Sequence, residues 1–274
     1  MHLSIFDIFK IGIGPSSSHT MGPMVAAARF LEMLRSGQNV IPGAGPLAAP
    51  GCNLHGSLSY TGRGHATDRA VILGLAGCKP DSFDREVWDG LEASIRQTGV
   101  VEVERLGPLA FDPAKDLKFE KGPALDGHAN GMVLSAYDAS GTLHSRETYY
   151  SIGGGFVVTE KELGLSNAAG TQATLPHGFK TAAELVARAE ETGLSIPHIV
   201  RANESAMVTA DQSRWIARFW AVMEEAINRG LSGSGTLPGG LRLPRRAKKI
   251  HDALMAEKGR NLTAPHVIND WISV

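Results

Sequence analysis

Five consecutive hydrogen-bonding side chains stand between two prolines in the segment GIGPSSSHTMGP, residues 12–23. They are Ser16, Ser17, Ser18, His19 and Thr20. The apolar run that follows, MVAAARFLEML, predicts a helix whose first backbone N–H groups lack partners and whose dipole is positive at this end. One hydroxyl is enough to cap a helix, whereas four hydroxyls and an imidazole can also bind a carboxylate or a phosphate. The residues alone leave a Ser-rich linker, a helix cap and an anion site open.

A second candidate group lies in HGSLSYTGRGHATDRAVILGL, residues 55–75. A strand-like run leads into the glycine-containing turn TGRGH, and we expect a helix to begin near Thr67. His65 stands at this junction, where functional side chains often project, and Asp68 falls in the first turn of the helix. The alternative is that Thr67 caps the helix and His65 is a solvated loop residue.

A third candidate group is the segment DGHANGM, in which His128 and Asn130 directly precede the strand-like run MVLSAY. Strand alternation would point both side chains to the same face. A histidine beside an amide can move a proton and hold a polar substrate. The alternative is a turn, which Asn and Gly favour. The histidines form no HxxxH unit and the cysteines no CxxC unit, so we expect no zinc site.

Composition and charge narrow the class of partner. The 274 residues include 27 basic and 28 acidic side chains, giving a net charge of -1, and this balance favours neither nucleic acid nor an anionic membrane. No run approaches the roughly 18 to 20 apolar residues of a membrane span. The first segment, MHLSIFDIFKIGIG, makes a poor signal peptide because Asp7 and Lys10 interrupt it. The only cysteines, Cys52 and Cys78, favour a reducing, cytoplasmic setting. A small polar partner is expected.

Short strand-like and helical runs alternate over residues 1–160, which predicts an α+β fold with a mixed α/β domain at the N-terminus. The strand-like runs are NLHGSLSY, VVEVERL and MVLSAYDASGTLHSRETYYSIGGGFVV, the last read as strand, turn and strand. Helices fit TMGPMVAAARFLEMLRSG, HATDRAVILGLAG and DSFDREVWDGLEASIRQTG. Each of these helical runs ends in a glycine that can adopt the left-handed conformation.

The second part of the chain has a helical pattern. Residues 161–177, which include much of the loop-like NAAGTQATLPHG, are expected to form a linker, and residues 178–274 a helical domain. Helices fit FKTAAELVARAEETG, DQSRWIARFWAVMEEAINRG and AKKIHDALMAEKG. One face of the second of these carries Trp215, Ile216, Phe219, Trp220, Met223 and Ile227. We expect this all-helical domain to be incomplete, since the sequence stops at HVINDWISV with apolar residues still to be buried.

The chain closely resembles the β domain of the bacterial iron-sulfur L-serine dehydratases (L-serine ammonia-lyases). The resemblance is carried by SIFDIFKIGIGPSSSHTMGPMVAA, HGSLSYTGRGHATDRAVILGL, DGHANGM and YYSIGGGFV. The later segments IVRANE and GSGTLPGGLRLPRRAKKIHDAL resemble the start of the same family's α, or catalytic, domain. The resemblance covers essentially the whole chain.

The resemblance implies a lyase that converts L-serine to pyruvate and ammonia. It implies a [4Fe-4S] cluster held by three cysteines, with one iron open to the substrate hydroxyl. The residues that would hold the substrate carboxylate and line the site are Ser16, Ser17, Ser18, His19 and Thr20. His65 and His128 are the candidates for proton transfer and Asn130 is a polar contact. The resemblance leaves open which histidine is the base.

The chain departs from the family in its cysteines, because neither Cys52 nor Cys78 matches a cluster ligand of the family. We therefore expect no metal ligand in this chain, an incomplete cluster site and little or no activity from the chain alone. The expected partners are L-serine and a second copy in a homodimer, which a separate catalytic chain can complete.

Three other functions stay open. The chain could be a non-catalytic module or regulatory fragment that binds serine or another small carboxylate. A Ser and His hydrolase is disfavoured because no GxSxG elbow surrounds residues 16–18. A nucleic-acid patch at RLPRRAKK, residues 242–249, competes with a solvated helix start there.

Overall fold

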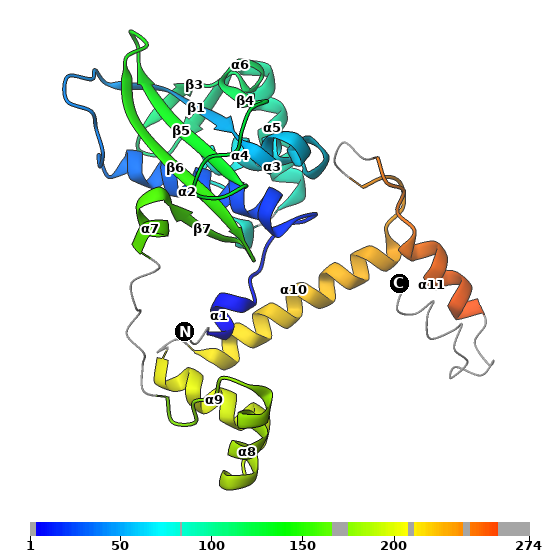
Figure 1. Cartoon of the computed structure of the whole chain (residues 1–274). Helices are drawn as coiled ribbons and strands as arrows, with labels where there is room; N and C mark the ends of the chain where they lie inside the picture. Colours follow the sequence, from blue (N-terminus) through cyan, green and yellow to red (C-terminus); the bar gives the residue numbers. More distant parts are fainter. Residues whose placement is uncertain (1–3, 83, 166–174, 208–210, 238–241, 257–274) are drawn as a thin grey trace. The chain divides into compact units, whose positions relative to one another are not determined.

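The computed structural model describes residues 4–82, 84–165, 175–207, 211–237 and 242–256. Contacts between residues divide the chain into two units, and Figure 1 colours the chain by position in the sequence. The sheet unit comprises Ile11–Asn167 and Ser234–Arg245, and the helical unit comprises Met1–Lys10, Ala168–Gly233 and Arg246–Val274. The α+β fold class expected from the sequence is confirmed. The linker at 161–177 stays a prediction.

The sheet unit is built on a five-stranded sheet of order β4-β1-β5-β6-β7. These strands are β1 (Leu47–Leu54), β4 (Leu117–Phe119), β5 (Gly131–Asp138), β6 (Leu143–Gly153) and β7 (Phe156–Thr159). β1 pairs with β4 in parallel, and the other neighbours are antiparallel. A separate hairpin joins β2 (Val100–Val103) to β3 (Gly107–Ala110). The prediction of a strand, a turn and a strand from residue 132 onward is confirmed for β5 and β6, but the final FVV of that segment belongs to the separate strand β7.

The helices of the sheet unit are α2 (Gly22–Arg35), α3 (Gly56–Thr61), α4 (Thr67–Leu75), α5 (Arg85–Thr98), α6 (Pro113–Asp116) and α7 (Glu160–Leu165). Of these, α2, α4 and α5 are the three that the sequence predicts. One π-helical turn, η1 (Ser17–Met21), precedes α2, and the 3-10 turns are η2 (Gly62–His65) and η3 (Pro80–Ser82). The glycines that follow α2, α4 and α5 all have positive φ, as expected for C-terminal caps.

The strand predicted over NLHGSLSY is wrong beyond its first residues. β1 ends at Leu54, and α3 begins at Gly56, whose φ is 52°. A side chain there would overlap the carbonyl of Ala129, so the backbone approaches that loop more closely than an alanine would allow. The alternation of polar and apolar residues suggested a continuous strand, but the chain turns at Gly56 and forms a short helix instead.

One hydrophobic core holds the helices α2 and α4 against the sheet. Phe30 of α2, Ile72 of α4 and Leu134 of β5 are all fully buried in it. Gly74 lets the two helices pack closely, because a Cβ there would lie 2.5 Å from the carbonyl oxygen of Met24 and 2.7 Å from Cβ of Ala27. This packing fixes the start of α2 relative to the start of α4.

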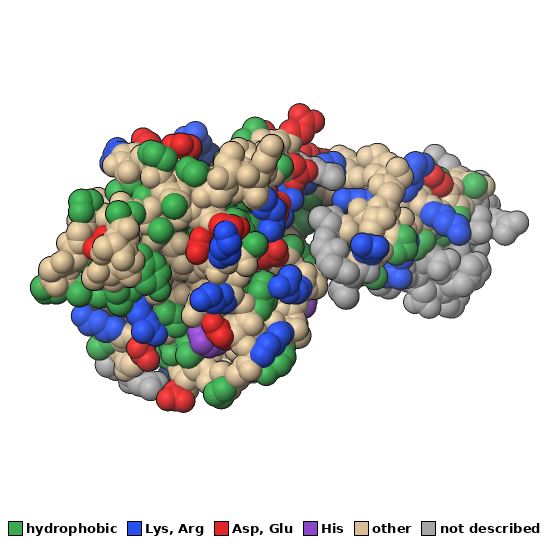
Figure 2. All heavy atoms as spheres, turned by 90° about the horizontal axis from the view of Figure 1, so that it is seen from above, with side chains coloured by type: hydrophobic (Ala, Val, Ile, Leu, Met, Phe, Trp, Pro, Cys, Tyr) green, Lys and Arg blue, Asp and Glu red, His purple; other side chains and the backbone are tan. Residues whose placement is uncertain are grey.

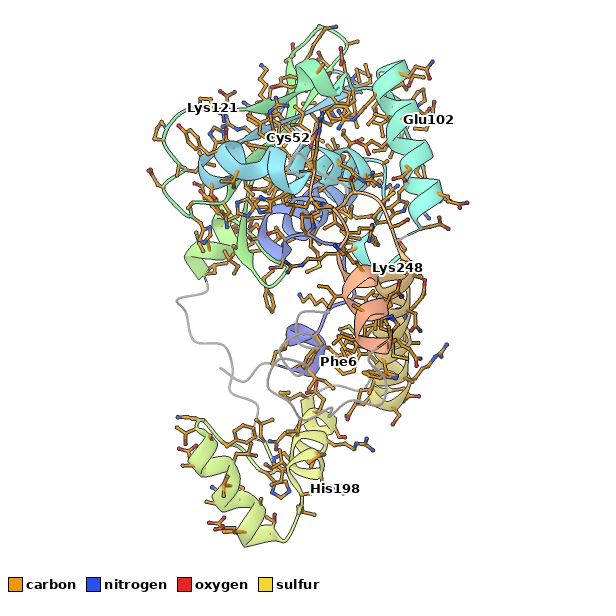
Figure 3. All side chains as sticks on the ribbon, turned by 90° about the vertical axis from the view of Figure 1, so that its right-hand side faces the viewer. Phe6, Cys52, Glu102, Lys121, His198 and Lys248 are labelled. Atoms are coloured by element: carbon orange, nitrogen blue, oxygen red, sulfur yellow. The ribbon has the colours of Figure 1, made fainter. Side chains whose placement is uncertain are left out.

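The helical unit contains α1 (Ile5–Ile8), α8 (Ala182–Thr192), α9 (Ile196–Met207), α10 (Gln212–Ser232) and α11 (Ala247–Ala256). Phe6 of α1, labelled in Figure 3, packs on Trp215 with ring centroids 4.8 Å apart. The buried carboxylate of Glu204 accepts hydrogen bonds from the Ser4 hydroxyl and the Ile5 backbone N–H. The three helices predicted after residue 178 are confirmed. The segment HVINDWISV and most of NAAGTQATL lie outside the described residues.

Basic and acidic side chains are interspersed on the face of the molecule seen in Figure 2. None of the helices in the described ranges combines the length and the apolar character that crossing a membrane requires.

Candidate active site

The Ser-rich segment forms the π-helical turn η1, which runs directly into α2. The Ser16 hydroxyl accepts a hydrogen bond from the His19 backbone N–H at 3.1 Å, and the Ser16 carbonyl accepts from Thr20 and Met21. The helix cap is therefore confirmed and the flexible linker is wrong. The N–H groups of Ser17 and Ser18 precede the first of the helical bonds, so they have no acceptor within the helix. Single π-helical turns are common at functional sites.

Glycines fix the position of this turn. A Cβ at Gly22 would overlap the hydroxyl of Ser151 in β6, and a Cβ at Gly12 or Gly155 would overlap the side chain of Met21. The GPSSSHT and SIGGGFV segments are far apart in the sequence. They pack closely because glycines lie where they meet. The Ser151 hydroxyl is fully buried and has no hydrogen-bond partner in the described part of the chain.

The His19 ring is held from both sides by hydroxyls. Its Nδ1 lies 2.8 Å from Ser18 Oγ and its Nε2 lies 2.9 Å from Ser57 Oγ. The ring also lies beside that of His65, with centroids 4.9 Å apart. Burial lowers the pKa of His19, the charge of His65 lowers it further, and a hydrogen bond with Ser57 opposes both. His19 is therefore held as a neutral imidazole at neutral pH.

The GPSSSHT and TGRGHATD segments clasp each other through two threonines. The Thr20 hydroxyl donates to the His65 carbonyl at 2.8 Å, and the Thr67 hydroxyl donates to the His19 carbonyl. Thr67 is buried at the first position of α4, and the residue before it, Ala66, occupies the capping position with a φ of 53°. Thr67 is therefore not the helix cap that the sequence suggested, because its hydroxyl is used on the other segment.

The hydrogen bond of His65 defines where its proton lies. Its Nδ1 is 3.0 Å from the Thr61 carbonyl, which can only accept, so Nδ1 carries the proton. In the neutral ring Nε2 then holds the lone pair. This is the tautomer that can accept a proton at Nε2.

His128 has the opposite arrangement. Its Nδ1 accepts a hydrogen bond from the Asn130 backbone N–H at 3.0 Å, so the neutral ring carries its proton on Nε2. β5 begins at Gly131, after both residues, so strand alternation does not apply to them and the turn is confirmed. The Asn130 amide donates to the Ser151 carbonyl at 3.1 Å. This ties the His128 loop to the strand that packs on the start of α2.

Two residues of the site were missed from the sequence. Ser57 was placed in a strand, and its hydroxyl instead reaches His19 from the first turn of α3. Ser151 stood in the quoted segment YYSIGGGFV without being singled out. The available signal for Ser57 was a polar residue directly after a glycine.

The two thiols of the chain do not fit an iron-sulfur cluster, which needs three thiolates. Cys52 of β1, labelled in Figure 3, is buried, and burial raises its pKa to about 12. Cys78 follows α4, and partial burial raises its pKa as well. The described residues contain no group of three or more His, Cys, Asp or Glu side chains placed to hold a metal ion.

Fold and site together define an α+β unit in which hydroxyls, imidazoles and backbone N–H groups with no acceptor in the helix meet at the start of α2. The family model for the serine dehydratase beta chain matches residues 4–162, and the chain belongs to this family.

Relatives match along nearly the whole chain. The L-serine dehydratase of Streptomyces coelicolor is 41% identical over 258 residues, covering 94% of this chain and 56% of the relative. L-serine dehydratase 1 of Escherichia coli is 39% identical over 279 residues, covering 99% of this chain and 58% of the relative. The L-serine dehydratase of Mycobacterium tuberculosis is 37% identical over 275 residues, with coverage of 100% and 58%. The chain spans a little over half the length of these curated relatives.

Proposed function

We propose that this chain supplies the substrate-binding part of an L-serine ammonia-lyase, which converts L-serine to pyruvate and ammonia. The observation that carries the proposal is the paired imidazoles of His19 and His65 beside the backbone N–H groups of Ser17 and Ser18, which have no acceptor within the helix. The names of the relatives, all L-serine dehydratases, support the choice of substrate.

Four of the five polar residues at the start of α2 divide into two roles. Ser16 caps the helix and Thr20 donates to the His65 carbonyl, so both hydroxyls support the site. The exposed Ser17 hydroxyl, together with the N–H groups of Ser17 and Ser18, faces no acceptor within the helix. We assign the substrate carboxylate to these donors, because an anion at a helix start gains from both the free N–H groups and the helix dipole.

Proton transfer is assigned by tautomer. His65 holds the lone pair on Nε2 and acts as the base that removes the α-proton of serine. His128 presents an N–H at Nε2 and serves as a hydrogen-bond donor, with Asn130 as its polar neighbour. Loss of the α-proton and of the hydroxyl, which departs as water, leaves an enamine. The enamine becomes an imine and takes up water, releasing pyruvate and ammonia.

The thiols of this chain give no support to a [4Fe-4S] cluster built from its own residues, so no step is assigned to one. Since the chain spans a little over half of its relatives, we propose that turnover requires polypeptide equivalent to the remainder. A homodimer and a cytoplasmic location stay predictions.

Calorimetric titration of the chain with L-serine, D-serine and phosphate tests the substrate assignment. We expect L-serine to bind more tightly than the other two, and His19→Ala and Ser17→Ala to weaken it. Equal binding of all three, or no effect of either substitution, contradicts the proposal.

A pyruvate assay after anaerobic iron-sulfur reconstitution tests the catalytic part. We expect turnover when the chain is supplied with the region that its relatives contain in addition, and little without it. Robust turnover by the chain alone contradicts the assignment of a substrate-binding part only.

A non-catalytic serine-binding module is the second candidate. It is favoured by the Ser-rich turn being packed entirely within the sheet unit. Binding of L-serine without turnover in the supplemented assay would support it.

A further inference from the structure

Tyr150 is a buried side chain of β6 that lies outside the main hydrophobic core. Its neighbour Tyr149 belongs to that core, and strand alternation turns Tyr150 to the opposite face of the sheet. The Tyr150 side chain is nonetheless only 1% exposed, and it is among the largest fully buried side chains of the described residues. The backbone that lies against its ring is that of Gly127, directly before His128.

Gly127 lies so close to the Tyr150 ring that the structure has no room for a side chain there. A Cβ at Gly127 would be 2.5 Å from Cζ, 2.7 Å from Cε2 and 2.8 Å from the hydroxyl oxygen of Tyr150. These distances are well below van der Waals contact, and a fully buried ring has little space to move aside. Gly127 does not have a positive φ, so space rather than backbone conformation requires a glycine. The ring therefore sets how closely this backbone approaches the sheet.

The two residues after His128 are held by hydrogen bonds. The carbonyls of Ala129 and Asn130 accept from the N–H groups of Ser57 and Ser151 at 2.8 and 3.0 Å. The Asn130 N–H in turn donates to Nδ1 of His128 at 3.0 Å. Because a backbone N–H can only donate, this bond keeps the proton of the neutral ring on Nε2. The bond depends on how the backbone on both sides of His128 is placed.

We propose that Tyr150 is a positioning residue for His128. Its ring supports the backbone at Gly127, so that Nδ1 of His128 meets the Asn130 N–H and Nε2 presents its own N–H to the ligand. The use of that N–H as a donor to L-serine rests on the proposed function, whereas the placement of the imidazole by Tyr150 stands without it.

A larger residue at position 127 combined with a smaller one at position 150 tests this placement. In Gly127→Ala the new methyl group meets the ring, and we expect the loop to move and the bond between Asn130 and His128 to break. In Gly127→Ala/Tyr150→Leu the ring atoms Cζ, Cε2 and Oη are absent, so the bond should form again.

Nitrogen-15 NMR of the neutral His128 ring in the unliganded chain measures the bond. We expect a protonated-type shift for Nε2 and an unprotonated-type shift for Nδ1 in the wild type and in the double variant. In Gly127→Ala both nitrogens should move toward the averaged shifts of a tautomer mixture. Tyr150→Phe, which loses only the hydroxyl, should keep the wild-type shifts.

Two matched controls separate this contact from a general effect on the fold. Gly122→Ala adds a methyl group to the same connection between β4 and β5, where nothing lies within 4 Å, and should leave the His128 shifts unchanged. Tyr149→Leu truncates the neighbouring buried tyrosine on the other face of the sheet. It should lower stability without restoring the wild-type shifts to Gly127→Ala.

Three results overturn the proposal. They are wild-type His128 shifts in Gly127→Ala, a double variant no closer to wild type than Gly127→Ala, and restoration by Tyr149→Leu as complete as by Tyr150→Leu. If Gly127→Ala does not fold, the two leucine variants decide by themselves. We then expect averaged His128 shifts in Tyr150→Leu alone, and equal shifts in the two leucine variants overturn the proposal.

Calorimetric titration with L-serine tests the part that depends on the proposed function. We expect Gly127→Ala to weaken binding roughly 3- to 10-fold, the range of one hydrogen bond, and the double variant to recover the wild-type affinity. Unchanged affinity in a Gly127→Ala chain with altered shifts overturns the use of the His128 N–H in binding. Failure of the wild type to bind L-serine contradicts the proposed function, and the NMR comparison still decides the role of Tyr150.

Discussion

The sheet unit and the helical unit use their apolar residues in opposite ways. In α2, ten of 14 residues are buried, whereas α10 buries none of its 21 residues and leaves Trp220 59% exposed. The packing of α2 fixes the Ser-rich turn that precedes it. The difference teaches that the geometry of the candidate site is fixed within the sheet unit, and that the exposed Trp220 of α10 adds little to stability within the described residues.

The largest expected difference in stability between the two units comes from truncating one aromatic residue in each. Phe30→Ala empties a fully buried site in α2 and should lower the free energy of unfolding of the sheet unit by about 3–5 kcal/mol. Trp220→Ala removes a mostly exposed ring and should cost less than about 0.5 kcal/mol. Hydrogen exchange of β5 and α10 amides measures each unit separately. Similar losses for the two variants contradict the comparison.

Gly74 tests whether the close approach of α2 and α4 supports the site. In Gly74→Ala the new methyl group presses on the Met24 carbonyl and on Ala27, and overpacking of this kind costs about 1–3 kcal/mol. We expect a weaker affinity for L-serine as well, because the two helix starts carry His19 and His65.

Gly90→Ala is the matched control for Gly74→Ala, since nothing lies within 4 Å of its Cβ position in α5. It should leave affinity unchanged and stabilise α5 slightly through helix propensity. If Gly74→Ala behaves like Gly90→Ala in urea unfolding and calorimetry, the packing argument is wrong.

Two helix caps, one in each unit, sharpen the comparison further. Ser16 caps η1 and Thr181 caps α8, where its hydroxyl accepts from the Glu184 N–H at 3.2 Å. Ser16→Ala and Thr181→Ala should each cost about 1 kcal/mol of stability in their own unit. Only Ser16→Ala should also lower the affinity for L-serine, because it loosens the turn that holds the ligand donors.

Ser17→Ala completes this test. The Ser17 side chain is exposed and makes no hydrogen bond to another described residue, so stability should not change. Affinity for L-serine should fall by roughly 3- to 10-fold, the range of one hydrogen bond. Lower stability with unchanged affinity would identify Ser17 as a structural residue.

The sequence predicted the helices and strands wherever hydrophobic periodicity and a terminal glycine agreed, as in α2, α4 and α5. It failed at NLHGSLSY, because the turn at Gly56 depends on the closeness of Ala129, which is distant in the sequence. The polar and glycine-containing surroundings of His19 and His65 identified both as candidate site residues. The Ser57 contact and the tautomers could not be predicted, since they depend on which carbonyl or hydroxyl each ring meets.

The smallest expected effect concerns the charge between the two paired imidazoles. The pKa of His19 is lowered by burial and by His65, so the unfolded chain takes up a proton at a higher pH than the folded one. The contribution of His19 to stability is therefore fully present above its ordinary pKa of 6.5 and is lost as the pH falls through the lowered folded pKa. His65→Gln removes the neighbouring charge and should raise the pKa of His19 toward its ordinary value.

An NMR titration of the His19 ring in wild type and in His65→Gln measures this shift. His144→Gln is the control, because the His144 ring bonds to Ser145 in β6 and does not contribute to the shift at His19. If the pKa of His19 rises in His65→Gln but not in His144→Gln, the hydrogen bonds between the two segments hold the imidazoles close enough for their charges to interact. A His19 pKa that stays constant or falls would mean that burial in the sheet unit alone holds the ring neutral, and the pairing of the imidazoles would then lose its electrostatic role.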